Sequence, residues 1–344
     1  MNNYLNEELK KVAEKLPFTE LKNKSILITG ATGLICSYIV DILMYLNLYN
    51  DANIRIIAMN RNKTMAMKRF SIYWNNSLFY YIQHDVAIPV SVEIPIDYII
   101  HGASSASPAK YVSHPIDTMK ANIEGVVNML NLAEVSHAKL LYISSGEVYG
   151  ESDGNDFIES YSGPIDPLLT RSCYPISKRA AETMCIAYQE QKNVEVVIAR
   201  PCHIYGHTMM ENDDRAVSQF IKNALRHEDI IMKSKGMQLR SYCYIADCAT
   251  AIFTILLYGK SGNAYNVANR DSVITISELA NRIAKVAGQK VIIQTATDIE
   301  SKGYSSVTKA VLDPSKIEQL GWKPLYSIED GISQTIYVLS RDIQ

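Results

Sequence analysis

The sequence has almost no net charge, because 34 lysine and arginine residues stand against 36 aspartate and glutamate residues, a formal charge of −2. It therefore lacks the general basic field that attracts nucleic acids or anionic membranes. Long apolar runs are also missing, and stretches such as 251–258 are too short to span a bilayer. The first residues are polar where a signal peptide needs an apolar core. These absences predict a cytoplasmic protein that binds neither nucleic acid nor membrane.

Paired cysteines and metal-ligand patterns are lacking as well. None of the six cysteines forms a CxxC pair, and a chain of 344 residues can bury a core without disulfides, so we expect reduced thiols. His203, His207 and Glu211 are spaced four apart, which on a helix would align three metal ligands. Pro201 and Gly206 argue against a helix there. The sequence predicts no metal site.

Apolar strands alternate with helical segments over the first 200 residues. The nearly all-apolar runs lie at 25–29, 53–59, 96–101, 139–144 and 195–199, and helical periodicity appears at 32–48, 119–135 and 176–191. This alternation predicts an α/β fold with a doubly wound parallel sheet of the Rossmann type, covered by helices on both faces. Such sheets bind ligands at the carboxyl ends of their strands.

Three regions are expected along the chain. Residues 1–24 form an N-terminal helical extension, residues 25–200 the Rossmann domain, and residues 201–344 mainly a smaller α/β substrate-binding region. After residue 201 the regular alternation gives way to polar loops, short helices at 215–226 and 276–286, and a strand at 291–294. No linker is apparent in the sequence between the two larger regions, so we expect them to be interleaved.

A glycine-rich turn, Gly30-Ala-Thr-Gly33-Leu-Ile-Cys36, follows the first strand and opens the first helix. Gly30 permits the tight turn, and Gly33 lets a pyrophosphate approach the amides at the helix N-terminus. A third glycine usually allows close contact between helix and strand. Cys36 occupies that position, and its small thiol is expected to fit after a slight outward shift. The motif predicts NAD or NADP as the cofactor.

The second strand ends in Asn60-Arg61 rather than in a carboxylate. An acid at this place accepts a hydrogen bond from the ribose 2′-hydroxyl of NAD, whereas Arg61 could pair with the 2′-phosphate of NADP. The sequence therefore favours NADP over NAD. Asp85, after the third strand, is the expected partner of the adenine amino group.

Tyr174-Pro-Ile-Ser-Lys178 places a phenol and an ammonium on one face of a predicted helix. The cation is expected to lower the pKa of Tyr174 from its usual value of about 10. The phenol could then exchange a proton with a hydroxyl or carbonyl group near neutral pH. Ser145 lies upstream at the end of a strand, where its hydroxyl would meet the same substrate oxygen. These residues, behind a phosphate-binding loop, predict an oxidoreductase site.

From about residue 24 to 337 the chain resembles the extended short-chain dehydrogenases/reductases of the NAD-dependent epimerase/dehydratase family, which act on nucleotide sugars. The motifs that carry the resemblance are GATGLIC (30–36), HGASSASP (101–108), KANIEGVVNML (120–130), SSGEVYG (144–150), YPISK (174–178), ARPCHIYG (199–206), RSYCYIAD (240–247) and LGWKP (320–324). The resemblance implies Ser145, Tyr174 and Lys178 as a catalytic triad. Residues 178–185 and RSYCYIAD look most like UDP-glucuronate decarboxylases.

The resemblance also implies residues around the two ligands. Glu147 would join the catalytic group, Asn122 is the helix asparagine near the active site, Arg240 binds the substrate diphosphate, and His203 replaces a substrate-binding asparagine. Beyond the glycines, Asn60, Arg61 and Asp85, the implied cofactor contacts are Thr32, Leu34, Ile35, Val86, Ala103, Ser104, Tyr174 and Lys178. Family members commonly pair through two helices of each subunit, and we expect a homodimer.

The chain departs from the family pattern near the substrate. Decarboxylases place an arginine shortly before the LGW segment, but between residues 301 and 320 this chain has only Lys302, Lys309 and Lys316 as cations. A lysine cannot reproduce a bidentate carboxylate clamp. The aspartate of the 4,6-dehydratase motif Thr-Asp-Glu is replaced by Gly146. These departures predict an unusual substrate.

Three hypotheses for function remain. The favoured one is net reduction of a keto group on a nucleotide-linked sugar, for example a ketose to an alditol for bacterial surface polysaccharides, because accessory acids are missing and the cofactor site leans towards NADP. The alternative is a redox-neutral 4-epimerase, decarboxylase or dehydratase with tightly bound NAD, which Glu147 supports. A dinucleotide-binding scaffold without turnover is disfavoured, since Tyr174 and Lys178 are both present.

Overall fold

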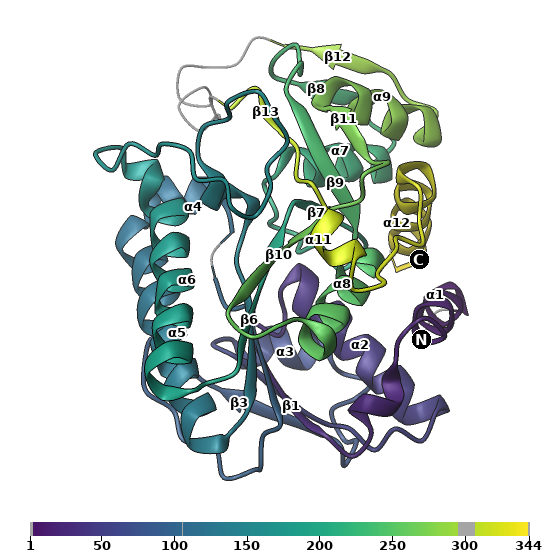
Figure 1. The fold of residues 1–344 in the computed structure, drawn as a ribbon. Coiled ribbons are helices and arrows are strands. Elements are labelled where there is room, and N and C mark those ends of the chain that lie inside the picture. The colour runs from purple at the N-terminus through teal and green to yellow at the C-terminus, as the bar shows by residue number, and fades with distance from the viewer. Residues whose placement is uncertain (1–2, 105, 295–306, 343–344) are drawn as a thin grey trace.

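The computed structural model describes residues 3–104, 106–294 and 307–342, and its centre is a seven-stranded parallel sheet (Figure 1). The strand order is β10-β6-β5-β4-β1-β2-β3, and every neighbouring pair is parallel. The strands are β1 Ser25–Thr29, β2 Arg55–Asn60, β3 Phe79–Gln83, β4 Tyr98–His101, β5 Lys139–Ile143, β6 Val196–Pro201 and β10 Asn263–Val267. The order reverses beside β1, which places the loops after β1 and β4 next to each other at the carboxyl edge.

Successive residues of each strand face opposite helix layers. In β1, Ile26 and Ile28 belong to the same core as α2 (Leu34–Tyr49) and α8 (Ile245–Tyr258). Leu27 belongs to a second core with α5 (Pro115–Ser136) and α6 (Cys173–Lys192) on the other side of the sheet. The two-residue period of a strand produces this alternation, and burial on both faces requires apolar side chains throughout. The predicted doubly wound sheet is confirmed.

Local sequence signals account for several helix ends. α2 begins at Leu34, two residues later than predicted, because Gly33 is its N-cap and has an extended backbone. α5 begins with Pro115, where a missing N–H costs no helical hydrogen bond. α9 (Ile276–Ala287) starts with a capping box of Thr275 and Glu278 and ends at a glycine with positive φ.

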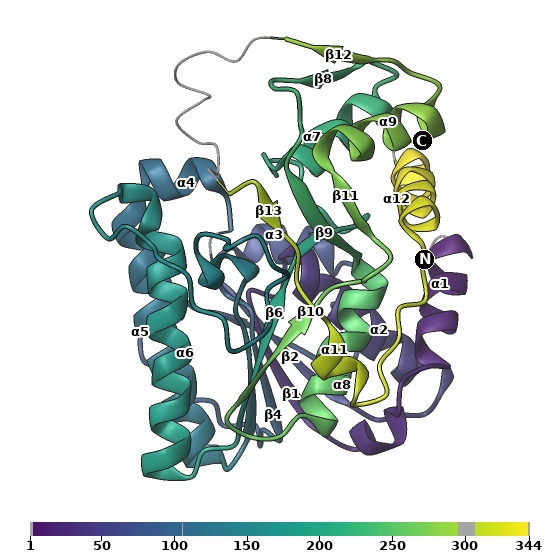
Figure 2. The ribbon, with the colours of Figure 1, turned by 45° about the horizontal axis from the view of Figure 1, so that its top comes forward.

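A smaller group of strands and helices lies at one end of the sheet (Figure 2). β9 (Leu239–Tyr244) pairs with β7 (His203–Tyr205), β11 (Val273–Thr275) and β13 (Lys309–Ala310), while β8 (Ile230–Met232) pairs with β12 (Val291–Ile293). The helices of this part are α7 Ala216–Leu225, α9, α11 Ser315–Glu318 and α12 Ile328–Asp342. Because β10 returns to the large sheet, the chain crosses between the two parts more than once.

Six further elements complete the described part of the fold. They are α1 (Asn3–Ala13), α3 (Lys63–Arg69), α4 (Pro108–Ser113), and the short 3-10 helices η1 (Phe18–Leu21), η2 (Gly146–Tyr149) and η3 (Thr170–Ser172). α1 lies beside α2 and near α12 at the right of Figure 1. Every described helix is either too short or too polar to cross a membrane.

Candidate active site

The predicted cofactor residues gather at the carboxyl ends of four adjacent strands. Loops after β1, β2, β3 and β4 carry them, and these strands lie side by side in the sheet. The residues placed there are Gly30, Thr32, Gly33, Leu34, Ile35, Asn60, Arg61, Asp85, Val86, Ala103 and Ser104. Hydrogen bonds join the loops, since Asn60 Nδ2 donates to Thr32 Oγ1 (2.7 Å) and Ala103 N donates to Thr29 Oγ1 (3.2 Å).

The glycine turn has the geometry that a pyrophosphate needs. Gly30 has φ +64°, and a Cβ there would lie 2.8 Å from the backbone of Ala103. Gly33 caps α2, so the first amides of the helix have no acceptor within the helix and are available to an anion. Cys36 is buried with its sulfur against Gly102, at the place a Cβ of that residue would occupy. A glycine on the neighbouring loop thus makes room for the thiol that replaces the third glycine.

Arg61, the residue behind the predicted NADP preference, is paired with a carboxylate. Its Nη1 lies 3.4 Å from Asp85 Oδ2, and its side chain is 69% exposed. Although such exposed pairs are weak, Asp85 partly offsets the charge that was expected to attract a 2′-phosphate. Asn60 is held in place, because Tyr81 Oη donates to its Oδ1 (2.7 Å). Arg61 therefore supports a preference for NADP less than the sequence indicated.

Ser145, Tyr174 and Lys178 lie together at the start of α6. The Lys178 ammonium is 5.8 Å from the centre of the Tyr174 ring, and Ser145 is hydrogen-bonded to the Tyr174 phenol. Ser145 also caps η2, since its Oγ accepts a hydrogen bond from Glu147 N (3.1 Å). Lys178 is buried and donates to the carbonyl oxygen of Ile143 (2.8 Å) at the end of β5. This bond joins the start of α6 to the end of β5.

The pKa of Tyr174 is raised to about 12, so the predicted lowering is wrong for this structure. Burial is the largest cause and the carboxylate of Glu147 adds to it, whereas hydrogen bonds with Ser145 and Tyr111 act in the opposite direction. Burial also lowers the pKa of Lys178 to about 7. The Lys178 ammonium is therefore itself desolvated, and it donates to a backbone carbonyl.

Glu147 lies beside the triad and forms an ion pair with Arg171. The distances are 3.3 Å from Nη1 to Oε2 and 3.5 Å from Nη2 to Oε1. Desolvation raises the pKa of Glu147, while the charges of Arg171 and Arg240 lower it. Arg171, in η3 directly before α6, was missed by sequence reasoning. Its position three residues before Tyr174 was the available signal.

Tyr111 of α4 is a second residue that the sequence did not reveal. Its ring stacks on that of Tyr174 with centroids 4.5 Å apart and an interplanar angle of 14°. It is 2% exposed, and its carbonyl oxygen accepts a hydrogen bond from the Cys173 thiol (3.6 Å). Because α4 and α6 are far apart in sequence, no local pattern links the two rings.

The residues predicted to bind substrate have mixed environments. Asn122 is buried, where its Nδ2 donates to Ser177 Oγ (2.8 Å) and its Oδ1 accepts from Ser104 Oγ (2.7 Å), so it connects α5 to α6. His203 is exposed at the start of β7, and its pKa is lowered by desolvation and by the charges of Arg240 and Arg215. The structure brings these groups to the same end of the sheet as the triad.

Arg240 is buried and directed at the main chain. Its Nη1 donates to the carbonyl oxygens of Leu239 (2.9 Å) and Thr308 (3.3 Å), and its Nη2 donates to that of Val307 (2.6 Å). The guanidinium thereby holds β9 to the segment that enters β13. Its contact with a substrate diphosphate stays a prediction.

The lysines that follow residue 301 do not contact Glu147 in the described part of the chain. Lys309 Nζ donates to the Gly154 carbonyl (2.8 Å) and lies 2.8 Å from Asp156 Oδ1. Lys316 Nζ donates to Asn263 Oδ1 (2.9 Å). Lys302 lies outside the described residues. Neither described lysine stands in for the arginine of the decarboxylases at the candidate active site.

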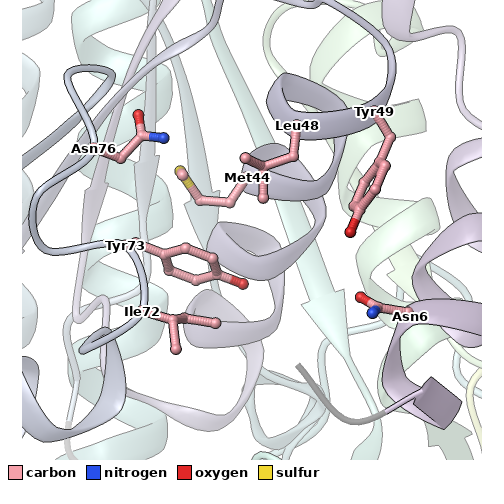
Figure 3. Close-up of a pocket in the computed structure, with 7 residues that line it drawn as sticks. All are labelled: Asn6, Met44, Leu48, Tyr49, Ile72, Tyr73 and Asn76. Atoms are coloured by element: carbon pink, nitrogen blue, oxygen red, sulfur yellow. The ribbon is translucent and has the colours of Figure 1, made fainter.

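A separate cavity of about 200 Å³ lies between α1, the C-terminal half of α2 and the segment after α3 (Figure 3). Its lining residues are Asn6, Met44, Leu48, Tyr49, Ile72, Tyr73 and Asn76. The predicted phosphate loop precedes the opposite, N-terminal end of α2. This cavity is therefore not part of the candidate active site.

The fold and the site define an extended short-chain dehydrogenase/reductase: a Rossmann sheet, a glycine turn at its carboxyl edge and a clustered Ser-Tyr-Lys set. Residues 26–268 match the model of the NAD dependent epimerase/dehydratase family, and the chain belongs to this family. Homologues of this kind are NAD-dependent enzymes that act on nucleotide sugars.

Two sequence relatives cover nearly the whole chain. A UDP-glucuronic acid decarboxylase 1 from Xenopus tropicalis is 33% identical over 95% of this chain and 74% of its own length. The protein of the same name from Danio rerio is 35% identical over 95% of this chain and 75% of its own length. The resemblance to decarboxylases drawn from the motifs is confirmed at the level of homology.

Solved structures support the same fold. A dTDP-glucose 4,6-dehydratase from Bacillus anthracis in complex with NAD has a TM-score of 0.78 and 21% identity, and the match covers 93% of this chain and 97% of that one. A UDP-glucuronic acid 4-epimerase from Bacillus cereus in complex with UDP-glucuronic acid and NAD has a TM-score of 0.76 and 22% identity, with 93% and 100% covered. At these identities the likeness concerns the fold.

Proposed function

We propose that the chain catalyses a redox-neutral reaction on a nucleotide-linked sugar and keeps NAD bound throughout. The observation that carries the proposal is Glu147, a carboxylate beside the triad that is held by Arg171. Net reduction needs only Ser145, Tyr174 and Lys178. A second acid is useful when the oxidised sugar must be altered before it is reduced again. This proposal replaces net reduction, which the sequence favoured, and the homology to decarboxylases supports the change.

The residues at the carboxyl edge fit NAD. The turn at Gly30 is too crowded for a side chain, and the N-terminus of α2 offers amides to a pyrophosphate. The solved neighbours are in complex with NAD, and the pairing of Arg61 with Asp85 weakens the case for NADP. We therefore propose NAD rather than NADP. When bound, it accepts a hydride from the sugar and returns it.

The residues of the chain divide the proton chemistry. Tyr174 receives the proton of the reacting hydroxyl group at its Oη and donates it back when the carbonyl is reduced. Ser145 Oγ hydrogen-bonds to the same sugar oxygen. Lys178, whose pKa is about 7, supplies positive charge that offsets the phenolate. Glu147 moves a second proton, to or from the carbon next to the carbonyl.

We propose a UDP-linked hexuronic acid as the substrate. Decarboxylation is then the reaction that takes place between oxidation of the sugar and its reduction. The support is the set of relatives named UDP-glucuronic acid decarboxylase, together with Glu147 at the active site. Oxidation at C4 places a ketone β to the C6 carboxylate, and such a keto acid loses carbon dioxide. The electrons of the broken C5–C6 bond form an enolate, which Glu147 protonates at C5.

Isotope tracing tests the redox-neutral cycle. UDP-glucuronic acid carrying deuterium at C4 is incubated with purified protein without added cofactor, and products are analysed by NMR and mass spectrometry. We expect a nucleotide-linked pentose that retains deuterium at C4, with no accumulation of NADH. A product that forms only with added NADPH, or that carries hydrogen from the added cofactor, would contradict the proposal.

Tyr174→Phe, measured in the same experiment, tests whether Tyr174 carries the proton. It removes one oxygen and leaves the ring that stacks on Tyr111. We expect turnover to fall by at least about 10²-fold, with unchanged bound NAD. Undiminished turnover would show that the proposed proton carrier is wrong.

We further propose a homodimer in a reducing compartment such as the cytoplasm. α5 and α6 lie side by side on one flank of the molecule (Figure 1), and Ile116 and Val135 on α5 are 69% and 75% exposed. All six cysteines are free thiols, which suits a reducing environment. Light scattering should give about twice the chain mass of 38.6 kDa, and a monomeric mass would contradict the dimer.

A further inference from the structure

Arg171, Arg215 and Arg240 act electrostatically on Tyr174 or on Glu147 beside it, and two of them are committed to other partners. Arg215 is fixed by Asp213, with Nη2 2.6 Å from Oδ2, and its Nη1 donates to the carbonyl oxygen of Ile204 (2.9 Å). Arg240 donates three hydrogen bonds to main-chain carbonyls next to β9 and β13. These two guanidinium groups hold loops together, and moving either would break the local structure.

Arg171 differs from both. Its described partner is Glu147, at 3.3 and 3.5 Å, which is long for a charge-assisted hydrogen bond. Its Nε is buried and has no hydrogen-bond partner among the residues that the structure describes. A buried N–H without an acceptor is costly, so the group is suited to a ligand that completes its bonding.

Among the described residues after 301, neither lysine takes the place of the arginine that the family resemblance implies before the LGW segment. Lys309 is held by Asp156 and the Gly154 carbonyl within the loop that precedes α6. An anionic group on the sugar would therefore need another partner, and a planar guanidinium matches a carboxylate in a way that an ammonium does not.

We propose that Arg171 binds the carboxylate of the sugar and gives up its ion pair with Glu147 when it does so. This inference rests on the proposed function and names the residue that selects its substrate class. Arg171 has two roles in turn: its charge lowers the pKa of Glu147 before substrate arrives, and it holds the substrate carboxylate afterwards.

The exchange leaves Glu147 with a changed set of neighbours. The charged and titratable groups that act on its carboxylate are Arg171 from η3, Arg240 from β9, Tyr111 from α4, and Cys173 and Tyr174 from α6. Without Arg171, Arg240 is the remaining cation in this set, and it already bonds to the main chain. Desolvation then favours the protonated acid. The proton comes from solvent, to which the Glu147 side chain is 35% exposed.

Binding to a matched pair of ligands tests the role of Arg171. UDP-glucuronic acid and UDP-glucose differ at C6, where one has a carboxylate and the other a hydroxymethyl group. Their Kd values are measured by calorimetry on the NAD-containing protein, in a Tyr174→Phe background so that neither is converted. We expect Arg171→Gln to weaken UDP-glucuronic acid binding by about tenfold to a hundredfold, and UDP-glucose binding by less than about twofold.

Two further variants make the outcome specific. Arg270→Gln removes one positive charge from a surface pair with Glu318 and should leave both Kd values unchanged. Arg171→Lys keeps the charge but loses the planar guanidinium that can donate two parallel hydrogen bonds to a carboxylate. It should restore only part of the preference for UDP-glucuronic acid. Circular dichroism and NAD content show whether each variant is folded.

The inference is overturned if Arg171→Gln leaves the ratio of the two Kd values unchanged, whether both ligands bind more weakly by the same factor or neither does. The same holds if the Tyr174→Phe protein binds UDP-glucose as tightly as UDP-glucuronic acid. None of these results touches the isotope experiment, which reports on redox neutrality. Failure of the Arg171 assignment is thus distinguishable from failure of the proposed function.

Discussion

Tyr174 illustrates how much a single residue depends on its surroundings. The YxxxK spacing correctly placed its phenol and the Lys178 ammonium on one helix face, with 5.8 Å between the ammonium and the ring centre. The spacing could not show that both groups are buried, which moves both pKa values against ionisation. Tyr111 escaped notice because only tertiary packing brings it to Tyr174. Arg171 lies close to the motif in sequence, but the YxxxK spacing does not include it and does not show that it pairs with Glu147.

Gly30 offers a sharp test at the residue scale. Gly30→Ala would place a Cβ 2.8 Å from the Ala103 backbone at a positive φ, so we expect loss of NAD from the purified protein and a lower Tm. The matched control is Gly288→Ala, also at positive φ (+70°) but with nothing within 4 Å. The control should cost about 1–2 kcal/mol and retain NAD. NAD retention by Gly30→Ala would contradict the assignment of the phosphate loop.

The N-terminal helix α1 shows what patterns reveal at the scale of an element. Helical structure was expected within residues 1–24, and α1 forms there and packs against α2. No pattern indicated that Glu8 is buried, where its carboxylate accepts hydrogen bonds from Tyr38 (2.6 Å) of α2 and Tyr244 (2.7 Å) of β9. This residue therefore links the extension to both parts of the molecule.

Glu8 makes the anchoring of α1 dependent on pH. Burial raises its pKa above the ordinary 4.5, so the folded state binds the proton more tightly than the unfolded state. Its contribution to stability is full below pH 4.5 and is lost as the pH rises through the raised pKa. We expect wild-type protein to lose stability relative to Glu8→Gln as the pH rises above 4.5 and through the raised pKa, as measured by Tm.

The exposed neighbour Glu7 supplies the control for this prediction. Glu7→Gln should follow wild type across the same pH range, because its side chain is already solvated. A constant difference in Tm between wild type and Glu8→Gln would show that the Glu8 carboxylate does not titrate between the two states.

Elements with strong periodicity were predictable, and most of the short strands were not, although β12 lies where a strand was expected. The strands around β1 are continuous apolar runs, so their positions agree with the predictions to within two residues. β13 has two residues, and β7 and β11 have three each, so no period can develop. All three short strands nevertheless pair with β9, which carries Arg240. The Arg240 guanidinium also bonds to the carbonyl oxygen of Val307, in the segment that leads into β13.

At the scale of the whole molecule, a net charge of −2 conceals a local concentration of cations. Arg171, Arg215 and Arg240 act on the same few groups around the triad. Composition predicted no nucleic-acid partner but could not locate this cluster, because its members come from separate elements. An anionic nucleotide sugar is bound, in this account, by placed groups rather than by a general field.

The resident cofactor is the most direct test of the central claim, which is a redox-neutral cycle on bound NAD. The purified protein is denatured without prior exposure to nucleotides, and the released small molecules are identified by chromatography and mass spectrometry. The account predicts close to one NAD per chain and no NADP. An empty protein that oxidises NADPH in proportion to a reduced sugar product would contradict it.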